Sequence, residues 1–155
     1  MIKDALAVYA GSQVQAAGAL IHALDTGRWL VVKRSKQVDD GNCWCSVGGK
    51  IVRGESAKQA ARREIGEEIG YWGEMRLYPA LVYEESWLRF YNHIGVVDKE
   101  FVPQLNWESQ SHQWIQDLEK VPKPVHFGLK ALLADSKSQR LIERVRAKST
   151  EYSAT

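Results

Sequence analysis

Three glutamates, Glu64, Glu67 and Glu68, lie close together in a segment made mostly of residues that favour helices. At about 100° per residue, Glu67 lies about 60° to one side of Glu64 and Glu68 about 40° to the other. Three carboxylates therefore share one helical face, where like charges repel. Mg²⁺ takes oxygen ligands and is normally shared between carboxylates and substrate phosphates. The spacing predicts a divalent-metal site that acts on phosphates; the alternative is a solvated acidic face with Arg62 and Arg63 as partners.

The helix that carries these glutamates has start and stop signals. Ser56 is a favourable N-cap, and Gln59 stands three residues later, as in a capping box. Gly70 stands where a left-handed C-cap is expected. These signals predict a helix over residues 56–69. Its apolar residues recur every four positions and place the acidic face at the edge of the core: Ala57, Ala61, Ile65 and Ile69.

The segment around this helix, residues 49–71, has the sequence GKIVRGESAKQAARREIGEEIGY. Its residues at fixed spacings are Gly49, Glu55, Arg63, Glu64, Ile65, Glu67, Glu68, Gly70 and Tyr71. This pattern resembles the signature box of the Nudix hydrolases. The resemblance implies an α/β fold, the Nudix-type α/β/α sandwich with a mixed β-sheet. It also implies a reaction in which water attacks the pyrophosphate of a nucleoside diphosphate linked to another group, with Mg²⁺ or Mn²⁺ as cofactor.

The resemblance assigns roles to residues by position. Glu64, Glu67 and Glu68 are implied as the metal-binding and water-activating carboxylates, and both Glu64 and Glu67 remain open as the general base. The backbone carbonyl of Gly48 is implied as a further metal ligand. In the family an extra acidic ligand often lies on a loop before the last strand, and Glu108 is the candidate here; the alternative is an exposed loop glutamate.

Other positions are implied to support the site or depart from the family pattern. Glu55 and Arg63 resemble the pair that braces the loop and helix. Val47 stands where relatives often have Pro, and Tyr71 stands where an aliphatic residue is usual. Neither departure touches an implied ligand, so the expected activity is unchanged, although loop geometry and substrate fit can differ.

Candidate substrate contacts lie outside the box. Arg34 follows an apolar strand and can meet substrate phosphates, because fixed cations stabilise charge on phosphoryl oxygens. Its neighbours Lys33 and Lys36 have the same potential, and surface solvation is the alternative for all three.

Aromatic faces suit the binding of a nucleobase. The chain contains six Trp. Those expected on strands beyond the box are the candidates for stacking, with a core position as the alternative: Tyr83, Trp87 and Tyr91.

Only the absence of sequence markers known from other relatives narrows the substrate class. The markers that distinguish relatives acting on ADP-ribose, NADH, coenzyme A or diadenosine polyphosphates are missing. (Deoxy)nucleoside triphosphates, including oxidised ones, therefore rank first and nucleotide sugars second. A non-hydrolysing nucleotide sensor is the other functional class; such relatives usually lose box glutamates, and this chain keeps them.

The composition fits a single domain. The chain has 155 residues, 45% of them hydrophobic and 26% charged, and a net charge of +2 that favours neither nucleic acid nor a membrane as partner. The expected partner is a small nucleotide, and the expected state is a monomer or homodimer. Residues 5–10 form an apolar run too short for a signal peptide, and the protein is expected in the cytoplasm. Cys43, Cys45 and the four histidines show no ligand spacing and are interpreted as structural.

The remaining pattern predicts the elements that position the site. Strands are expected over 15–24, 28–34, 43–47, 74–84, 87–97 and 112–115, the first two as a hairpin. Helices are expected over 127–135 and 137–148. The single domain, residues 1–155, is thus predicted to have a core at about 14–135, a C-terminal helix and a frayed tail at 149–155.

Overall fold

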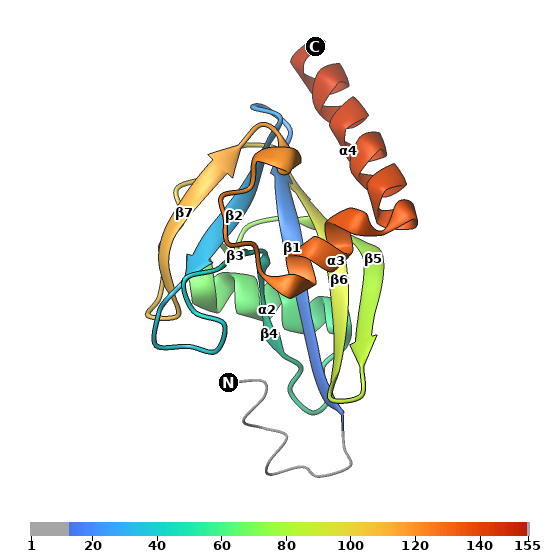
Figure 1. Cartoon of the computed structure of the whole chain (residues 1–155). Coiled ribbons are helices and arrows are strands. Elements are labelled where there is room, and N and C mark those ends of the chain that lie inside the picture. The colour runs from blue at the N-terminus through green and yellow to red at the C-terminus, as the bar shows by residue number, and fades with distance from the viewer. Residues whose placement is uncertain (1–12, 155) are drawn as a thin grey trace.

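In the computed structural model, which describes residues 13–154, helices cover both faces of one mixed sheet (Figure 1). Its strands are β1 (Val14–Ala23), β2 (Arg28–Arg34), β3 (Trp44–Cys45), β4 (Val47–Lys50), β5 (Arg76–Glu85), β6 (Leu88–Val97) and β7 (Ser109–Ile115). The order is β3-β2-β1-β6-β5, while β4 pairs with β1 and β7 with β2. β1 and β6 are parallel and the other pairs are antiparallel, which confirms the predicted mixed sheet and α/β/α sandwich.

The apolar run at residues 5–10 lies outside the described residues. Within residues 13–154, no helix combines the length and the apolar content that crossing a membrane requires.

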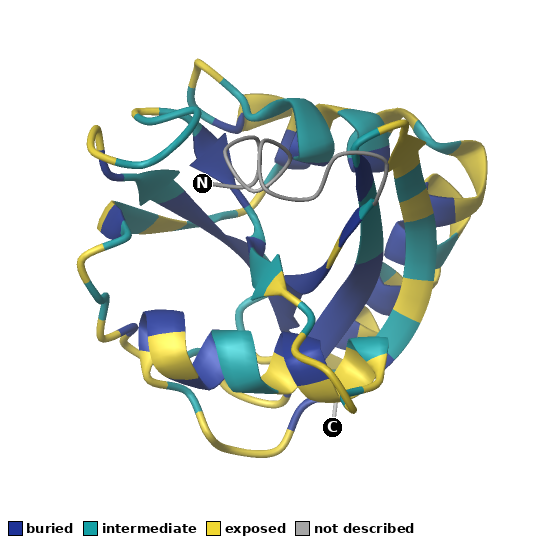
Figure 2. Ribbon diagram, turned by 90° about the horizontal axis from the view of Figure 1, so that it is seen from below, coloured by how far each residue is buried: buried dark blue, intermediate teal, exposed yellow. Residues whose placement is uncertain are grey.

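The central strand β1 is buried along most of its length (Figure 2). Its side chains alternate between two core clusters on opposite faces of the sheet. Ala17 and Ile21 belong to the cluster that includes residues of helix α2 (Ala57–Ile69). Leu20 belongs to the cluster on the opposite face. Successive strand residues point to opposite faces, so a nearly continuous apolar run is what a doubly covered strand requires.

Strand β4 approaches β1 unusually closely because both strands have glycine at the point of contact. Gly18 of β1 is paired with Gly48 of β4. A Cβ on Gly18 would lie 2.2 Å from the Val47 carbonyl oxygen, and one on Gly48 would lie 2.6 Å from that of Ala17. The Phe90 ring would be 3.0 Å from either added atom. This close contact places β4 between α2 on one face of the sheet and Phe90 on the other.

Helix α2 has the predicted ends. The Ser56 side chain accepts a hydrogen bond from the Gln59 N–H at 3.1 Å, and the Gln59 side chain accepts one from the Ser56 N–H at 2.8 Å. Gly70 adopts the left-handed conformation, with φ of 70°. The capping box and C-cap are therefore both confirmed, and they fix the rotation of the helix that carries the glutamates.

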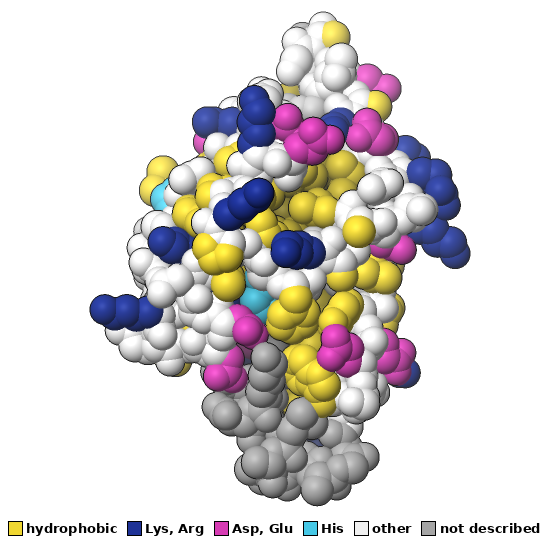
Figure 3. All heavy atoms as spheres, in the orientation of Figure 1, with side chains coloured by type: hydrophobic (Ala, Val, Ile, Leu, Met, Phe, Trp, Pro, Cys, Tyr) yellow, Lys and Arg dark blue, Asp and Glu magenta, His cyan; other side chains and the backbone are white. Residues whose placement is uncertain are grey.

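The opposite face is covered by η1 (Leu118–Lys120), α3 (Phe127–Ala134) and α4 (Ser136–Ala154). Figure 3 shows apolar side chains gathered on this face, with lysines and arginines around them. The predicted helix end at residue 148 and frayed tail are wrong, because α4 continues to Ala154. The Ser149 hydroxyl donates to the Leu24 carbonyl at 2.6 Å, and Tyr152 packs against the core cluster. These contacts hold the last turns of the helix.

Two other boundaries differ from the prediction. The strand expected over 43–47 is divided into β3 and β4, which pair with different neighbours. β7 begins at Ser109 rather than residue 112, because its pairing with β2 continues past a register shift to Arg34. This earlier start brings the predicted ligand Glu108 to the end of the strand.

Candidate active site

Glu68 is the buried member of the acidic cluster. It is 6% exposed, and its carboxylate accepts a hydrogen bond from the backbone N–H of Gly48 on β4. Burial raises the pKa of Glu68 well above its ordinary value, and the carboxylates of Glu108 and Glu64 raise it further. The nearby Arg34 guanidinium opposes this shift. Glu68 thus lies among like charges in a poorly solvated position.

Glu64 lies against the next residue of β4. A Cβ on Gly49 would lie 2.5 Å from the Glu64 carboxyl carbon and 2.6 and 2.7 Å from its oxygens. Burial raises the pKa of Glu64, whereas its hydrogen bond with Arg63 lowers it. Glycine at position 49 is therefore required for this carboxylate to reach its place. Glu68 therefore contacts Gly48 of β4, and Glu64 contacts Gly49.

Arg63 connects the helix to the preceding loop. Its Nε and Nη2 donate to the Glu55 carboxylate at 2.8 and 3.0 Å, and Nη2 also donates to the Lys50 carbonyl at 2.9 Å. Its Nη1 donates to Glu64 at 2.9 Å and to Glu67 at 3.1 Å. The Arg63 hydrogen bond lowers the pKa of Glu55. These contacts match the bracing role implied for Glu55 and Arg63, and they also orient two of the candidate ligands.

Glu67 differs from its neighbours in exposure. Its side chain is 51% exposed, compared with 12% for that of Glu64. It shares the Arg63 guanidinium with Glu64 but keeps access to solvent. A proton acceptor must reach a water molecule, and Glu67 satisfies that condition better than the buried Glu68.

The loop before β7 is tied to the end of α2 through Asn106. The Asn106 N–H donates to the Glu68 carbonyl at 3.0 Å, and its side chain donates to the Glu67 carbonyl at 3.3 Å. Its side-chain oxygen accepts from the Glu108 N–H at 2.9 Å. Carbonyls in the last turn of a helix lack intrahelical partners, so this loop satisfies them. The same contacts bring Glu108 within electrostatic range of Glu64 and Glu68.

These residues fit a divalent cation in their chemistry. Their donors are all oxygens, and the pKa of Glu64 and of Glu68 is raised in part by neighbouring carboxylates, a repulsion that a hard cation would remove. Across residues 13–154, no three His, Cys, Asp or Glu side chains already converge in a coordinating arrangement. Arg63 engages Glu64 and Glu67 instead.

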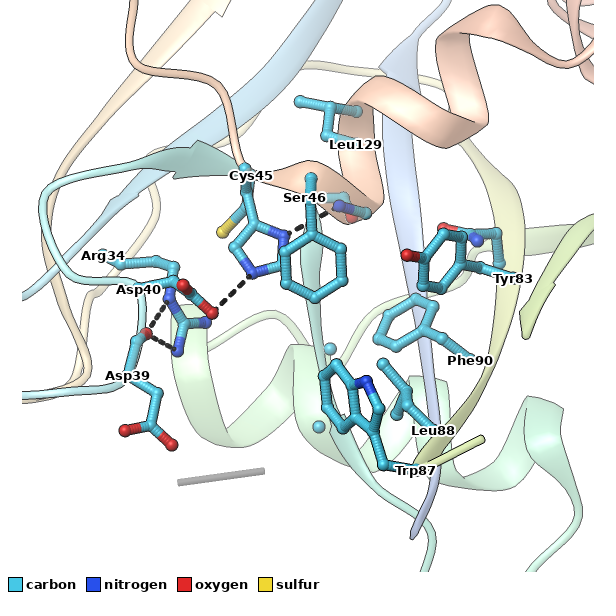
Figure 4. Close-up of a pocket in the computed structure, with 16 residues that line it drawn as sticks. Arg34, Asp39, Asp40, Cys45, Ser46, Tyr83, Trp87, Leu88, Phe90 and Leu129 are labelled. Atoms are coloured by element: carbon cyan, nitrogen blue, oxygen red, sulfur yellow. Dashed lines mark hydrogen bonds and ion pairs between the residues drawn. The ribbon is translucent and has the colours of Figure 1, made fainter. Parts of the chain in front are cut away.

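A cavity lies beside Gly48 and Gly49. Figure 4 shows Arg34, Asp39 and Asp40 on one side and Tyr83, Trp87, Leu88 and Phe90 on the other. The cavity is also lined by residues of β3, the β3–β4 link, β6 and the N-cap and start of α3: Cys45, Ser46, Asn92, His126, Phe127, Gly128 and Leu129. β4 therefore separates an acidic site from a largely aromatic cavity.

The aromatic wall is organised around Glu85. The Trp87 indole N–H donates to Glu85 at 2.6 Å, and the Tyr83 hydroxyl donates to the same carboxylate. This hydrogen bond raises the pKa of Tyr83 to about 12. The ring centroids of Tyr83 and Trp87 lie 5.6 and 6.1 Å from that of Phe127. The wall is thus fixed by hydrogen bonds as well as by packing.

The predicted substrate contacts are only partly brought together. Tyr83 and Trp87 line the cavity, but Tyr91 does not, because its ring packs on the opposite face of the sheet, against the cluster under α2. Arg34 lines the cavity and donates to the Asp39 carbonyl at 2.9 and 2.6 Å. Burial raises the pKa of the Cys45 thiol to about 12, so this cavity residue is not a thiolate nucleophile.

Several site residues were not anticipated from the sequence. Asn106 follows a proline-containing loop, and nothing in its local sequence indicates that it meets α2. From the sequence, Asp40 was assigned no role and His126 was interpreted as a structural histidine. Both line the cavity, where His126 Nε2 lies 3.7 Å from Asp40 Oδ2. Their proximity depends on the fold, since they are far apart in the chain.

Comparisons with known proteins agree with this geometry. The sequence model of the NUDIX domain matches residues 13–135. A stretch of 50 residues is 46% identical to the dihydroneopterin triphosphate diphosphatase of Escherichia coli (strain K12), covering 32% of this chain and 31% of that protein. The chain therefore matches about a third of this relative's length.

Solved structures show the same fold. The MutT NUDIX hydrolase from Burkholderia pseudomallei is similar with a TM-score of 0.64 and 22% identity, covering 81% of this chain and 98% of that chain. RenU, a Nudix hydrolase from M. smegmatis, is similar with a TM-score of 0.71 and 22% identity, covering 87% of each chain.

Proposed function

The chain belongs to the Nudix family, and on that premise we propose that it is a divalent-metal-dependent pyrophosphohydrolase whose substrate is a nucleoside triphosphate. One observation carries the proposal. The carboxylates of Glu64 and Glu68 lie against the glycines of β4, and an aromatic cavity lies beside the same glycines. A phosphate chain at the carboxylates and a base in the cavity can therefore belong to one molecule.

The proposed metal ligands are Glu64, Glu67, Glu68, Glu108 and the Gly48 carbonyl, with Mg²⁺ or Mn²⁺ as the ion. A bound divalent cation neutralises diphosphate charge and lowers the pKa of a coordinated water. The role of the protein is to hold buried carboxylates in fixed positions. Burial of Glu68 and the close packing of Glu64 on Gly49 supply that rigidity.

We assign the proton-accepting step to Glu67 or Glu64, and exposure favours Glu67. The carboxylate takes a proton from the attacking water, the new bond forms between the water oxygen and a phosphorus atom, and pyrophosphate leaves with the bridging oxygen. Arg63 holds both glutamates through the same Nη1 atom. It is therefore a positioning residue in this scheme.

In this proposal the cavity binds the base of the substrate. Tyr83 and Trp87 offer ring faces for stacking, and Arg34 has its guanidinium fixed by the Asp39 carbonyl beside the acidic site. Arg34 is in range of the Glu68 charge, so its guanidinium can neutralise a phosphate that enters the site. Tyr91 is left out of the base site because it packs on the other face of the sheet.

A second candidate substrate is the triphosphate of a pteridine. The relative with 46% identity over 50 residues is named as a dihydroneopterin triphosphate diphosphatase. A pteridine is a bicyclic ring similar in size to a purine, so the same aromatic cavity suits both. The two candidates require the same acidic site and differ only in the ring that occupies the cavity.

The experiment is a substrate panel with product identification. Pyrophosphate and phosphate release are measured for purine and pyrimidine triphosphates, oxidised purine triphosphates, dihydroneopterin triphosphate and nucleotide sugars, with Mg²⁺ and with EDTA. Turnover of a triphosphate that is lost with EDTA and in Glu67→Gln and Glu68→Gln supports the proposal. If only nucleotide sugars are hydrolysed, they replace triphosphates as the proposed substrate class. Nucleotide binding without turnover would instead indicate a sensor.

A further inference from the structure

The polar side of the cavity includes two side chains that the proposed hydrolysis does not use. Asp40 and His126 come from the β2–β3 loop and from the N-cap of α3. Both side chains are partly exposed, by 32% for Asp40 and 17% for His126. Both line the same cavity as Tyr83, Trp87 and Phe90, and Figure 4 shows Asp40 across from these rings. The Phe127 ring packs beside His126, with the ring centroids 4.2 Å apart. A base stacked on the aromatic wall would present its edge to Asp40 and His126.

The loop that carries Asp40 is held rigidly. The Asn42 N–H donates to the Arg34 carbonyl at 3.0 Å, and the Gln110 side chain donates to the Asn42 side chain at 2.6 Å. Gly41 is packed so tightly that a Cβ would lie 2.7 Å from the Ser35 carbonyl oxygen. Asp40 and Asn42 have φ of 52° and 62°, a region that non-glycine residues rarely adopt. Such backbone conformations concentrate at ligand sites.

His126 is held in one orientation and one neutral tautomer. The His126 N–H donates to the Trp44 carbonyl at 2.9 Å, which fixes its backbone to β3. Its Nδ1 accepts from the Gly128 N–H at 3.1 Å, so in the neutral ring the proton is on Nε2. Nε2 lies 3.7 Å from Asp40 Oδ2. The polar side of the cavity therefore presents a donor beside a carboxylate acceptor.

We propose that Asp40 and His126 recognise the edge of a 2-amino-4-oxopyrimidine ring, the element shared by guanine and pterins. This ring has an N–H and an adjacent amino group that donate to one carboxylate, and beside them an oxygen that accepts from His126. The proposal rests on the proposed function for the position of the triphosphate, and it specifies the base. Adenine fits poorly, because the carboxylate would face a ring nitrogen lone pair.

The test uses nucleoside monophosphates, so that it does not depend on hydrolysis. The dissociation constants of GMP and IMP, which differ only in the 2-amino group, are measured by calorimetry with wild type and Asp40→Asn. Hydrogen bonds to charged groups predict that wild type binds GMP about 10- to 100-fold more tightly. In Asp40→Asn the preference should fall below about 3-fold.

The variants are chosen to preserve the fold. Asn adopts positive φ readily, so Asp40→Asn should melt within about 2 °C of wild type. Asp98→Asn removes a surface carboxylate that pairs with Arg76 and should leave the GMP preference unchanged. Equal affinity of wild type for GMP and IMP, including binding of neither, would overturn the inference. So would a preference that survives in Asp40→Asn. A GMP preference in a protein that hydrolyses no triphosphate would overturn only the proposed function.

Discussion

The acidic site on α2 and the aromatic cavity beside β4 are assembled in different ways. Most of the acidic site comes from one continuous segment, in which helix periodicity brings Glu64, Glu67 and Glu68 together. The cavity combines the β2–β3 loop, β4, the β5–β6 hairpin and the start of α3. β4 is shared by both, since Gly48 and Gly49 border each of them. The comparison suggests that one region carries out the reaction and the other selects the substrate.

The largest effect is expected at the acidic site. Glu67→Gln should lower kcat by about 1,000-fold, because it removes a proton acceptor, while KM changes little. The side chain is half exposed, so the fold should tolerate the change. Steady-state kinetics with the substrate found in the panel measures both constants. Glu143→Gln, which alters an exposed pair on α4, is the control. A loss below about 10-fold would remove Glu67 from the reaction.

The boundary between the regions is tested by Gly49→Ala. The added Cβ would collide with the Glu64 carboxylate, so kcat/KM should fall about 100-fold through displacement of that group. Gly66→Ala is the matched control in the same segment. There the added Cβ meets the Trp72 ring, which is 70% exposed and able to move. Equal activity of the two variants would mean that the position of Glu64 does not limit the reaction.

Substitutions in the cavity should change KM rather than kcat. Trp87→Ala removes a stacking surface and should raise KM about 10-fold with kcat within about 3-fold of wild type. Trp72→Ala removes an exposed indole outside the cavity and should leave both constants unchanged. A fall in kcat as large as that expected for Glu67→Gln would contradict the division between the two regions.

The smallest effect is expected where a distant loop meets the acidic site. Asn106→Ala removes the side-chain bonds to the Glu67 carbonyl and the Glu108 N–H, so the free energy of unfolding should fall by about 1 kcal/mol. Chemical denaturation measures this change. Gln104→Ala keeps the backbone bond from Gln104 to Ile69 and is the control. An unchanged midpoint for Asn106→Ala would show that the loop is held by other contacts.

The same contrast explains what the sequence could and could not predict. Capping by Ser56 and Gly70 and the shared face of the glutamates follow from short-range periodicity, and the structure agrees with them. Tyr91 was assigned to the base site, although it packs on the face of the sheet that α2 covers. The helix end at residue 148 was missed because the burial of Ser149 depends on the distant Leu24 carbonyl.

Contacts between distant segments were beyond local patterns. Asp40 and His126 meet only because β3 holds the segment before α3, through the two backbone bonds between Trp44 and residues 124 and 126. Asn106 likewise acquires its role from the end of α2. A single sequence contains no spacing that relates such positions, whereas the acidic face lies within one helix.

The most direct test of the division between the two regions is Mn²⁺ binding, followed by electron paramagnetic resonance. It compares wild type, Glu68→Gln and Trp87→Ala, without substrate. We expect Glu68→Gln to weaken Mn²⁺ binding by at least about 10-fold and Trp87→Ala to bind as wild type does. Wild-type affinity in Glu68→Gln would contradict the assignment of the acidic face of α2 as the metal-dependent centre.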